Sequence, residues 1–282
     1  MAHVQATGVS LAYGDRDILR NVTVNLRTGD RCALAGANGS GKSTLMRILA
    51  EQIAPDSGTV TRSAGARISY LPQSGISHRG LTLLAEVETA YGDIRRIIQE
   101  RNRLGDELAH VTPGDDTAMQ LVHRHHELEE RIQASGYYER DAEIDRVLRG
   151  LGFRTEDMER PTAEFSGGWQ MRMALAKVLL ERPDFLLLDE PTNYLDVEAR
   201  IWLGRFLANY PGGVLLVSHD RRFLDETVNT IWELFLAEVK RYRGTYSAYE
   251  RHRQQELEET IAAWEQQQEE IRRIEDFVRR FR

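Results

Sequence analysis

One stretch of the sequence restricts the fold more than any other: GANGSGKST, at residues 36–44. It matches the pattern G-x-x-x-x-G-K-[ST], and it lies between the apolar run RCALA and the amphipathic run TLMRILAE. Where a strand enters such a loop and a helix leaves it, the backbone N–H groups of the loop can surround phosphates. The sequence therefore predicts an α/β core built around a phosphate-binding loop.

The side chains of this loop have separate expected roles. Lys42 offers a point charge to the β and γ phosphates of a nucleotide, and the Ser43 hydroxyl can ligate Mg²⁺. The candidate phosphate-binding residues are Gly36, Asn38, Gly39, Ser40, Gly41, Lys42, Ser43 and Thr44. The alternative, an incidental glycine turn, is disfavoured by the strand and helix patterns on either side.

Two later apolar runs end in polar residues. Phe185–Leu188 leads into Asp189 and Glu190, and Val214–Ser218 leads into His219. Ligands of open α/β sheets bind at the carboxyl ends of strands. We expect Asp189 on the Mg²⁺ side of the site and Glu190 as the general base that polarises water, although two acids there could simply cap the next helix.

Three further polar or aromatic residues are candidates of lower specificity. His219 is expected to contact the γ-phosphate, although a lone histidine is more often structural. Gln73 follows the short run YL and has an amide that can reach a metal or a water. Tyr13 could stack on a base, but a partly buried strand tyrosine is an equal alternative.

The stretch FSGGWQMRMALAK, at residues 165–177, is expected to begin a helix. Met171, Ala174, Leu175, Val178 and Leu179 follow the helical period on one face, with Ser166 as the N-cap. An N-terminus with small residues exposes N–H groups that favour an anion at Ser166, Gly167 and Gly168. The alternative is an ordinary capped helix.

The rest of the chain divides by pattern. Residues 3–36 indicate short strands separated by turns. Residues 81–150 are charged and helical, and we expect two antiparallel helices there, joined by TPGDD into a projecting arm. Residues 247–282 predict a third long helix, whose apolar seam needs a partner: Leu257, Ile261, Trp264, Ile271, Ile274, Val278 and Phe281.

Composition excludes several classes. The chain has 282 residues and a net charge of −7, from 37 Lys and Arg against 44 Asp and Glu, which disfavours a protein that coats nucleic acid with its whole surface. Its one cysteine, Cys32, and its start, MAHVQATGVS, indicate the cytosol. No run is long enough to span a membrane.

Two charged segments have alternative interpretations. HRHHE, at 123–127, is expected to be a solvated face rather than a metal site. The terminal IRRIEDFVRRFR either contacts RNA phosphates or flanks a coiled coil.

Taken in order, these motifs resemble those of the ATP-binding cassette ATPases over about residues 3–236. The resemblance implies a P-loop NTPase cassette that uses ATP and Mg²⁺, with the metal held by Ser43, Gln73 and Asp189. It also implies that Tyr13 stacks on adenine, that Gln73 forms the Q-loop and that residues 166–170 form the signature loop. Asp196 then corresponds to the D-loop aspartate and His219 to the switch histidine.

Within that superfamily the chain resembles the ABC-F branch, through its arm, FSGGWQMR, DEPTNYLD and YRGTYSAYERHRQQELEE. Tyr194 stands where many members have histidine. The resemblance implies a soluble protein with two cassettes joined by a helical linker, which enters the vacant exit-side tRNA site of the ribosome and contacts tRNA and ribosomal RNA. This chain has one P-loop and one signature, so it resembles the first cassette, residues 1–240 with an arm at about 81–140, plus the start of the linker, residues 241–282.

The leading hypothesis is an ATP-hydrolysing translation factor, and a ribosome-protecting antibiotic-resistance factor is an alternative. A transporter ATPase subunit and an ATP-gated interaction module with little turnover are further alternatives. In this family the signature of one cassette closes on ATP held by another, either the C-terminal half of the full protein or a second copy. We therefore expect this chain to bind ATP but to hydrolyse it poorly unless it dimerises. Because it stops in mid-helix, we also expect that the sequence continues.

Overall fold

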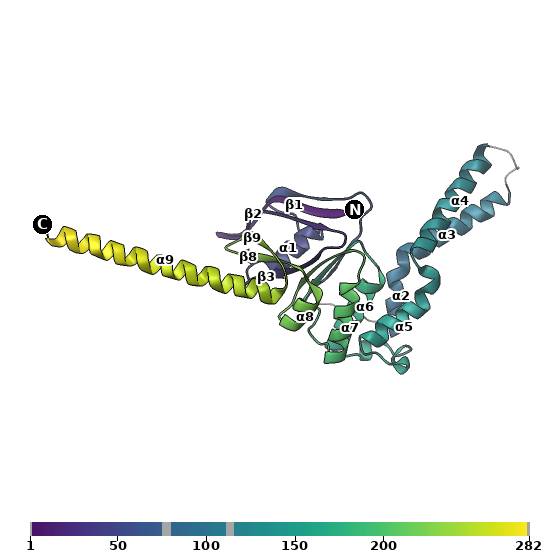
Figure 1. Cartoon of the computed structure of the whole chain (residues 1–282). Coiled ribbons are helices and arrows are strands. Elements are labelled where there is room, and N and C mark those ends of the chain that lie inside the picture. Colours follow the sequence, from purple (N-terminus) through teal and green to yellow (C-terminus); the bar gives the residue numbers. More distant parts are fainter. Residues whose placement is uncertain (1, 75–79, 111–115, 281–282) are drawn as a thin grey trace.

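The computed structural model describes residues 2–74, 80–110 and 116–280. A compact body carries a two-helix arm on one side and a long single helix on the other (Figure 1). Most of the expected TPGDD turn, and Phe281 of the expected seam, lie outside the described residues.

The chain begins with a three-stranded antiparallel sheet in the order β2-β1-β4. Its strands are β1 (His3–Tyr13), β2 (Arg16–Arg27) and β4 (Ser57–Arg62). Val4 and Ala6 of β1 are buried, as are Val9 and Leu11 after a shift in register between Ala6 and Val9. Within each pair the residues alternate, because successive side chains of a strand point to opposite faces. The predicted β-rich opening is confirmed.

The second sheet has six strands in the order β5-β6-β7-β3-β8-β9. They are β5 (Ile68–Leu71), β6 (Phe185–Asp189), β7 (Gly213–Val217), β3 (Arg31–Ala35), β8 (Thr230–Phe235) and β9 (Glu238–Arg243). All pairs are parallel except β8 with β9. Every residue of β3, β6 and β7 is buried, which explains their continuous apolar sequences.

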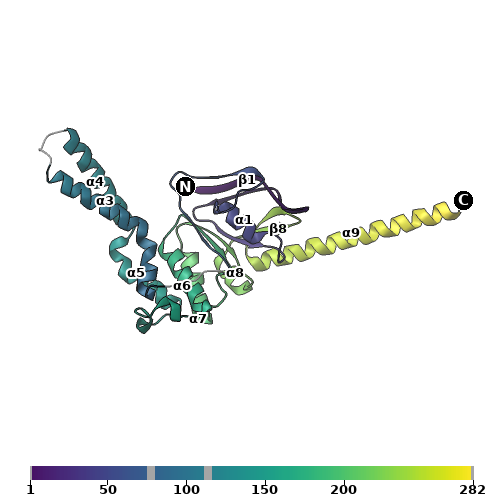
Figure 2. The same ribbon diagram turned by 180° about the vertical axis from the view of Figure 1, so that it is seen from behind.

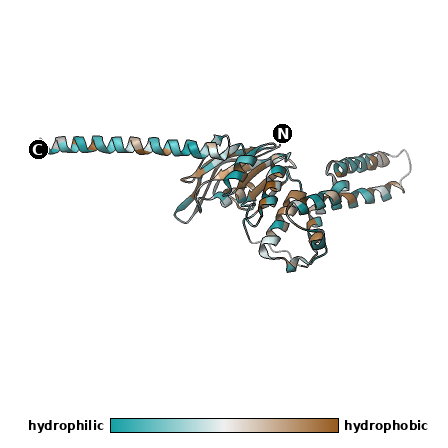
Figure 3. Cartoon of the chain, turned by 60° about the horizontal axis from the view of Figure 1, so that its bottom comes forward, coloured by the Kyte–Doolittle hydropathy of each residue, from teal (hydrophilic) through white to brown (hydrophobic). Residues whose placement is uncertain are grey.

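The two faces of this sheet belong to different cores. Phe185 and Leu187 of β6 join α1 (Lys42–Leu49) and the three-stranded sheet in one cluster. Leu186 and Leu188 join a second cluster with the helices of the other face, which include α6 (Gly167–Leu180), α7 (Val197–Ala208) and α8 (Arg221–Thr227). Figure 3 shows the apolar residues gathered inside this body. The sheet is therefore covered on both faces.

Helix α6 is present where the sequence predicts it, but its buried surface is wider than the expected single face. Met173, Ala176 and Leu180 are buried together with Ala174, Leu175 and Leu179, whereas Met171 and Val178 are only partly buried. Ser166 occupies the N-cap position, yet its side chain makes no capping hydrogen bond. More than one face of α6 is buried because three elements pack against it: α2 (Leu83–Glu88), α5 (Arg140–Gly150) and β5.

Only part of the expected arm projects. Helices α3 (Gly92–Leu108) and α4 (Asp116–Ala134) extend away from the body, while α2 and α5 lie against it (Figure 1). A short 3₁₀ turn, Thr89–Tyr91, joins α2 to α3, and another, Tyr137–Glu139, precedes α5. Ion pairs join the two arm helices, from Arg101 to Glu129 at 2.8 Å and from Arg124 to Glu100 at 3.0 Å.

Helix α9 (Tyr246–Arg280) starts on the body and then extends into solvent (Figure 2). Its first turns are held by the buried carboxylate of Glu233 on β8, which accepts hydrogen bonds from Tyr249 at 2.9 Å and Arg253 at 2.7 Å. Five seam residues are exposed, as expected of a face without a partner in the described residues: Leu257, Ile261, Trp264, Ile271 and Ile274. No helix among the described residues has the length and hydropathy needed to cross a bilayer.

Candidate functional site

A pocket of about 540 Å³ lies at the carboxyl ends of the parallel strands. It gathers residues from the glycine loop, from β1 and β2, and from the segments that follow β5, β6 and β7. Its lining residues are Tyr13, Ile18, Asn38, Gly39, Gly41, Lys42, Ser43, Thr44, Gln73, Asp189, Glu190, Val217 and His219. The fold thus brings together candidates that are more than 200 residues apart in the sequence.

The glycines of the loop are required by its geometry. Gly36 has φ of 148° and Gly41 has φ of 107°, a region that residues with a Cβ rarely adopt. A Cβ on Gly36 would lie 2.5 Å from the carbonyl oxygen of Leu234, and one on Gly41 would lie 2.7 Å from the Ile18 side chain. The loop can therefore turn tightly against β8 and β2 and present its backbone N–H groups to the pocket.

The Lys42 amine lies inside the loop. Its Nζ atom donates hydrogen bonds to the carbonyl oxygens of Gly36, at 2.9 Å, and Ala37, at 3.0 Å. Burial lowers the pKa of Lys42, and the nearby carboxylates of Glu190 and Asp189 oppose that shift. Two carbonyl oxygens are weak partners for a cation, so a phosphate oxygen can replace them as an acceptor.

The loop also fits a phosphate at Ser40. The Ser40 Oγ atom is buried and has no hydrogen-bond partner among the described residues. Helix α1 starts at Lys42, and its N-cap, Gly41, has no side chain that could accept from the first N–H groups. Unpaired donors at a helix N-terminus form a site that suits an anion.

The two acids after β6 differ in surroundings. Asp189 is buried and accepts a long hydrogen bond from the Tyr70 hydroxyl, at 3.4 Å. Glu190 is 6% exposed, and neither of its carboxylate oxygens accepts a hydrogen bond from the described residues. Its backbone has φ of 54°, a conformation held by the bond from its N–H to Val217 O at 2.9 Å.

These surroundings raise the pKa of Glu190. Burial is the largest cause and Asp189 adds to it, whereas His219 and Lys42 act in the opposite direction. His219 Nε2 lies 3.4 Å from Oε1 of Glu190. A buried carboxylate with unused lone pairs and a raised pKa is suited to accept a proton from water.

The remaining pocket candidates are accessible to a ligand. Tyr13 is 57% exposed at the end of β1, so the alternative of a partly buried strand tyrosine is not supported. Gln73 lies two residues after β5 and is exposed at the pocket. The side chain of His219 is 70% exposed, although its Nε2 atom is close to Glu190.

The other candidate anion site lies outside this pocket. Ser166 and Gly167 are exposed, and Gly168 packs against the ring of Tyr194. Asp196 caps α7 by accepting from the Ala199 N–H at 2.9 Å. None of Ser166, Gly167, Gly168 and Asp196 lines the pocket that contains Lys42.

Sequence reasoning did not single out Arg172, which joins this second group. Its guanidinium donates to Tyr194 O at 2.7 Å, to Leu151 O at 3.0 Å and to the Asp196 carboxylate at 3.0 Å, and it stacks over the Trp169 ring at 4.5 Å. Trp169 and Arg172 are three residues apart, so on a helix their side chains are neighbours. That spacing could have indicated the stacking contact, but not the three hydrogen bonds.

The HRHHE segment lies on α4 and is mostly exposed, as expected of a solvated face. His123 and His126 are exposed, and each pairs with a glutamate one turn later, Glu127 at 3.3 Å and Glu130 at 3.4 Å. Within the described residues no group of three or more His, Cys, Asp or Glu side chains is arranged to hold a metal ion.

Comparison with known families and proteins gave consistent matches. A family model described as ABC transporter matches residues 19–193, and a second with the same description matches residues 232–282. The uncharacterised ABC transporter ATP-binding protein YfmM of Bacillus subtilis is 33% identical over 280 residues, which are 99% of this chain and 54% of the relative. ABC transporter F family member 5 of Arabidopsis thaliana is 34% identical over 278 residues, or 98% of this chain and 40% of the relative. The chain spans about half or less of these relatives.

Solved structures show the same fold at lower identity. An ATP-binding subunit of an ABC transporter superposes with a TM-score of 0.64 at 19% identity, covering 88% of this chain and 92% of the other. A dimeric post-hydrolysis state of the cassette MJ0796, bound to ADP and phosphate, gives 0.56 at 21% identity, covering 85% and 98%.

Proposed function

This chain belongs to the ABC transporter family as an ATP-binding cassette, and from that premise we propose that it is half of an ATPase that hydrolyses ATP between two cassettes. The observation that carries the proposal is the separation of the two groups of candidate anion-binding residues. Lys42 and Glu190 share one pocket, while Ser166–Gly168 lie on the surface outside it.

Within the pocket, the proposed binding roles follow from chemistry and position. The loop N–H groups, Ser40 and Lys42 hold the phosphates, and Tyr13 stacks on the base. Ser43, Gln73 and Asp189 supply the oxygen ligands that Mg²⁺ prefers. When bound there, Mg²⁺ neutralises negative charge on the phosphate oxygens.

In the proposed hydrolysis Glu190 acts as the general base. It takes a proton from water as the water oxygen forms a bond to the γ-phosphorus and the bond from that phosphorus to the β–γ bridging oxygen breaks. The products are ADP and inorganic phosphate, and the proton on Glu190 returns to solvent. His219, close to Glu190, contacts the γ-phosphate and positions the carboxylate.

The site as proposed is completed by a second cassette. Its signature loop, equivalent to Ser166–Gly168, closes on the γ-phosphate held at Lys42, and the D-loop residue Asp196 lies at the same interface. The cassette MJ0796, which has the same fold, is dimeric in a post-hydrolysis state bound to ADP and phosphate, which supports pairing of two cassettes. Because the chain spans about half of its relatives, the second cassette is either a further part of the full protein or another copy of this chain.

The broader proposed role is that of an ABC-F protein in the cytoplasm, which binds the ribosome and regulates translation. Support comes from the match to the Arabidopsis F family member over nearly the whole chain, the projecting arm and the long helix α9. The proposed partners are ribosomal RNA and tRNA. Ribosome protection against antibiotics is the alternative within this class. The ATPase subunit of a transporter is a further alternative, since such a subunit shares the fold, but the projecting arm and helix α9 favour the ABC-F role.

A sedimentation experiment tests this role. The full protein with Glu190→Gln should retain ATP binding but not turnover, so it should co-sediment with ribosomes in ATP. Enrichment above the nucleotide-free sample supports the proposal. Equal pelleting with and without ATP, while ATP binding is intact, would contradict it.

A further inference from the structure

A second cavity, of about 650 Å³, lies at the amino ends of β6 and β7, on the opposite side of the six-stranded sheet from the strand ends that form the nucleotide pocket. It is formed between α5 and α7, beside Pro183 and Asp184, which precede β6, and Gly212, which precedes β7. It shares no lining residue with the pocket around Lys42. Its volume is in the range of cavities that hold small molecules.

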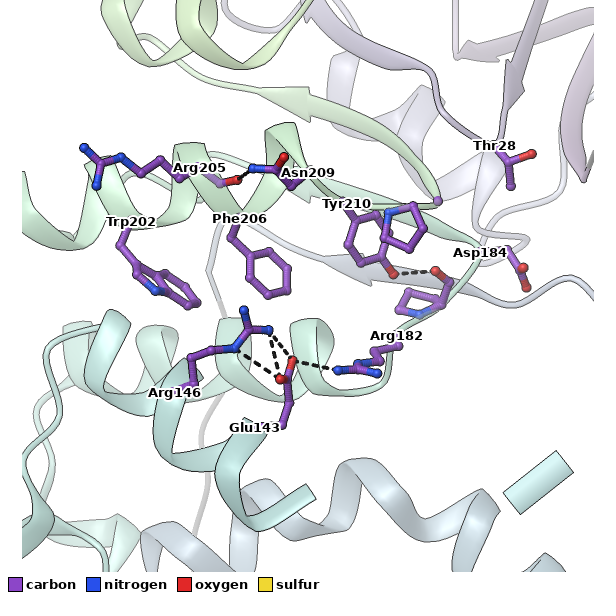
Figure 4. A pocket seen from close by; sticks show the side chains of 13 residues that line it. Thr28, Glu143, Arg146, Arg182, Asp184, Trp202, Arg205, Phe206, Asn209 and Tyr210 are labelled. Atoms are coloured by element: carbon purple, nitrogen blue, oxygen red, sulfur yellow. Dashed lines mark hydrogen bonds and ion pairs between the residues drawn. The ribbon is translucent and has the colours of Figure 1, made fainter. Parts of the chain in front are cut away.

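One wall of the cavity is a row of aromatic rings. Trp202, Phe206 and Tyr210 are spaced by four residues, on α7 and just past its end, so they project from one face of the helix (Figure 4). The ring centroids of Trp202 and Phe206 are 5.3 Å apart and those of Phe206 and Tyr210 are 6.1 Å apart, each pair inclined by 31°. Trp202 and Phe206 are partly exposed and offer apolar surface to a flat ring, whereas Tyr210 is buried behind them.

The cavity is shaped by the protein itself. A Cβ on Gly150 of α5 would collide with the indole of Trp202, so the glycine lets the ring lie against the helix. At the other end, the Arg31 guanidinium donates to the carbonyl oxygens of Tyr210 and Gly212, and the Tyr210 hydroxyl donates to Pro183 O. These contacts hold the aromatic wall in place before any ligand binds.

Of the charged side chains that line the cavity, one arginine has no partner among the described residues. Glu143 pairs with Arg146 at 2.7 Å and with Arg182 at 3.2 Å, as Figure 4 shows. Asp184 accepts a hydrogen bond from the Arg67 N–H at 2.8 Å. Arg205 is exposed at the rim of the same cavity, and its guanidinium has no hydrogen bond or ion pair within residues 2–74, 80–110 and 116–280, so it is free to turn toward a ligand. Three arginines thus face two carboxylates.

We propose that this cavity binds a small, flat aromatic compound with one negative charge, such as an aromatic carboxylate. The ring lies against Trp202 and Phe206, and the anionic group pairs with Arg205. A single excess positive charge matches a monoanion better than a phosphate dianion. This site is separate from the nucleotide pocket, and the inference does not depend on the proposed ATPase function.

A titration with 2-naphthoate, followed by ligand-observed NMR, tests the proposal on the whole chain. We expect saturable binding with a Kd of about 1 mM or tighter, as ordinary ligand efficiency gives for about a dozen heavy atoms. Two analogues separate the contributions. Cyclohexanecarboxylate has the negative charge but no aromatic ring, and 2-naphthalenemethanol has the aromatic rings but no charge. Both should bind about tenfold more weakly than 2-naphthoate.

Variants locate the site. Arg205→Ala and Phe206→Leu should each weaken naphthoate binding several-fold, and Phe206→Leu keeps an apolar side chain so that the fold is preserved. Two controls should leave the affinity unchanged: Arg243→Ala removes an exposed arginine on β9, and Tyr13→Ala removes the exposed ring of the nucleotide pocket.

Three results would overturn the proposal. They are the absence of saturable binding, an affinity that Arg205→Ala and Phe206→Leu leave unchanged, and equal affinity for naphthoate and naphthalenemethanol. The last result would assign the cavity to an apolar occupant, such as a side chain of a partner protein. Thermal melting of each variant shows that the fold is intact.

Discussion

Replacing Glu190 by glutamine should have opposite effects on turnover and on stability. Loss of a general base typically lowers a rate by about 10²- to 10⁴-fold, and hydrolysis should fall by that order. ATP binding should survive, because Lys42 and the loop N–H groups are untouched. Turnover is measured by phosphate release and affinity by equilibrium titration of ATP.

The stability effect follows from the burial of the carboxylate. Glu190 is buried, without a hydrogen bond to its carboxylate oxygens among the described residues, and burial raises its pKa. An acid whose pKa is raised in the folded state destabilises the fold as pH rises from its unfolded pKa through its folded pKa. At neutral pH the neutral amide should therefore stabilise the protein, by about 1 kcal/mol or about 2 °C in Tm.

The pH dependence supplies the check. The Tm difference between Glu190→Gln and the unsubstituted protein should be largest at pH 7 and should shrink as the pH falls through the unfolded-state pKa of glutamate, about 4.3, below which the carboxylate becomes protonated in both states. Glu265→Gln, an exposed acid on α9, is the matched control and should change neither turnover nor Tm. A variant that melts lower at pH 7, or that hydrolyses ATP at an undiminished rate, would refute this reasoning.

Three other predictions concern separate parts of the molecule. Gly36→Ala should abolish ATP binding in a filter assay, because its Cβ would lie 2.5 Å from a β8 carbonyl oxygen; binding within twofold of normal would contradict this. Arg172→Lys should lower turnover about tenfold at unchanged ATP affinity, since lysine cannot make the guanidinium's three hydrogen bonds and ring stacking together. An altered Kd for ATP together with normal turnover would contradict this prediction. Glu233→Gln should cost about 2 kcal/mol and expose the start of α9 to limited proteolysis, whereas unchanged cleavage would show that other contacts anchor the helix.

Much of the nucleotide pocket could be predicted because its residues occur in short, ordered motifs. Gly36–Thr44 joins a strand to a helix, and Asp189, Glu190 and His219 follow continuous apolar runs. Parallel strands bring their carboxyl ends to one edge, so strand assignment alone places these residues together. The sequence also indicated that the expected signature loop belongs to a different surface, through the family resemblance rather than through periodicity.

What could not be predicted depends on contacts between distant segments. Arg172 reaches Leu151 and Tyr194 only because α6 lies between two loops, and no local pattern encodes that. The extra burial of α6 has the same origin, since helices pack on it from several sides. The row at Trp202, Phe206 and Tyr210 has the spacing of an ordinary core stripe, and only the cavity beside it distinguishes the two.

The central claim, that hydrolysis requires a second cassette, is tested most directly by ATP turnover per chain as a function of chain concentration. Mass is measured by analytical ultracentrifugation on the same samples. The account predicts that turnover per chain rises in proportion to the fraction of dimer and approaches zero where the chain is monomeric. Substantial turnover per chain that stays constant across strictly monomeric samples would contradict it.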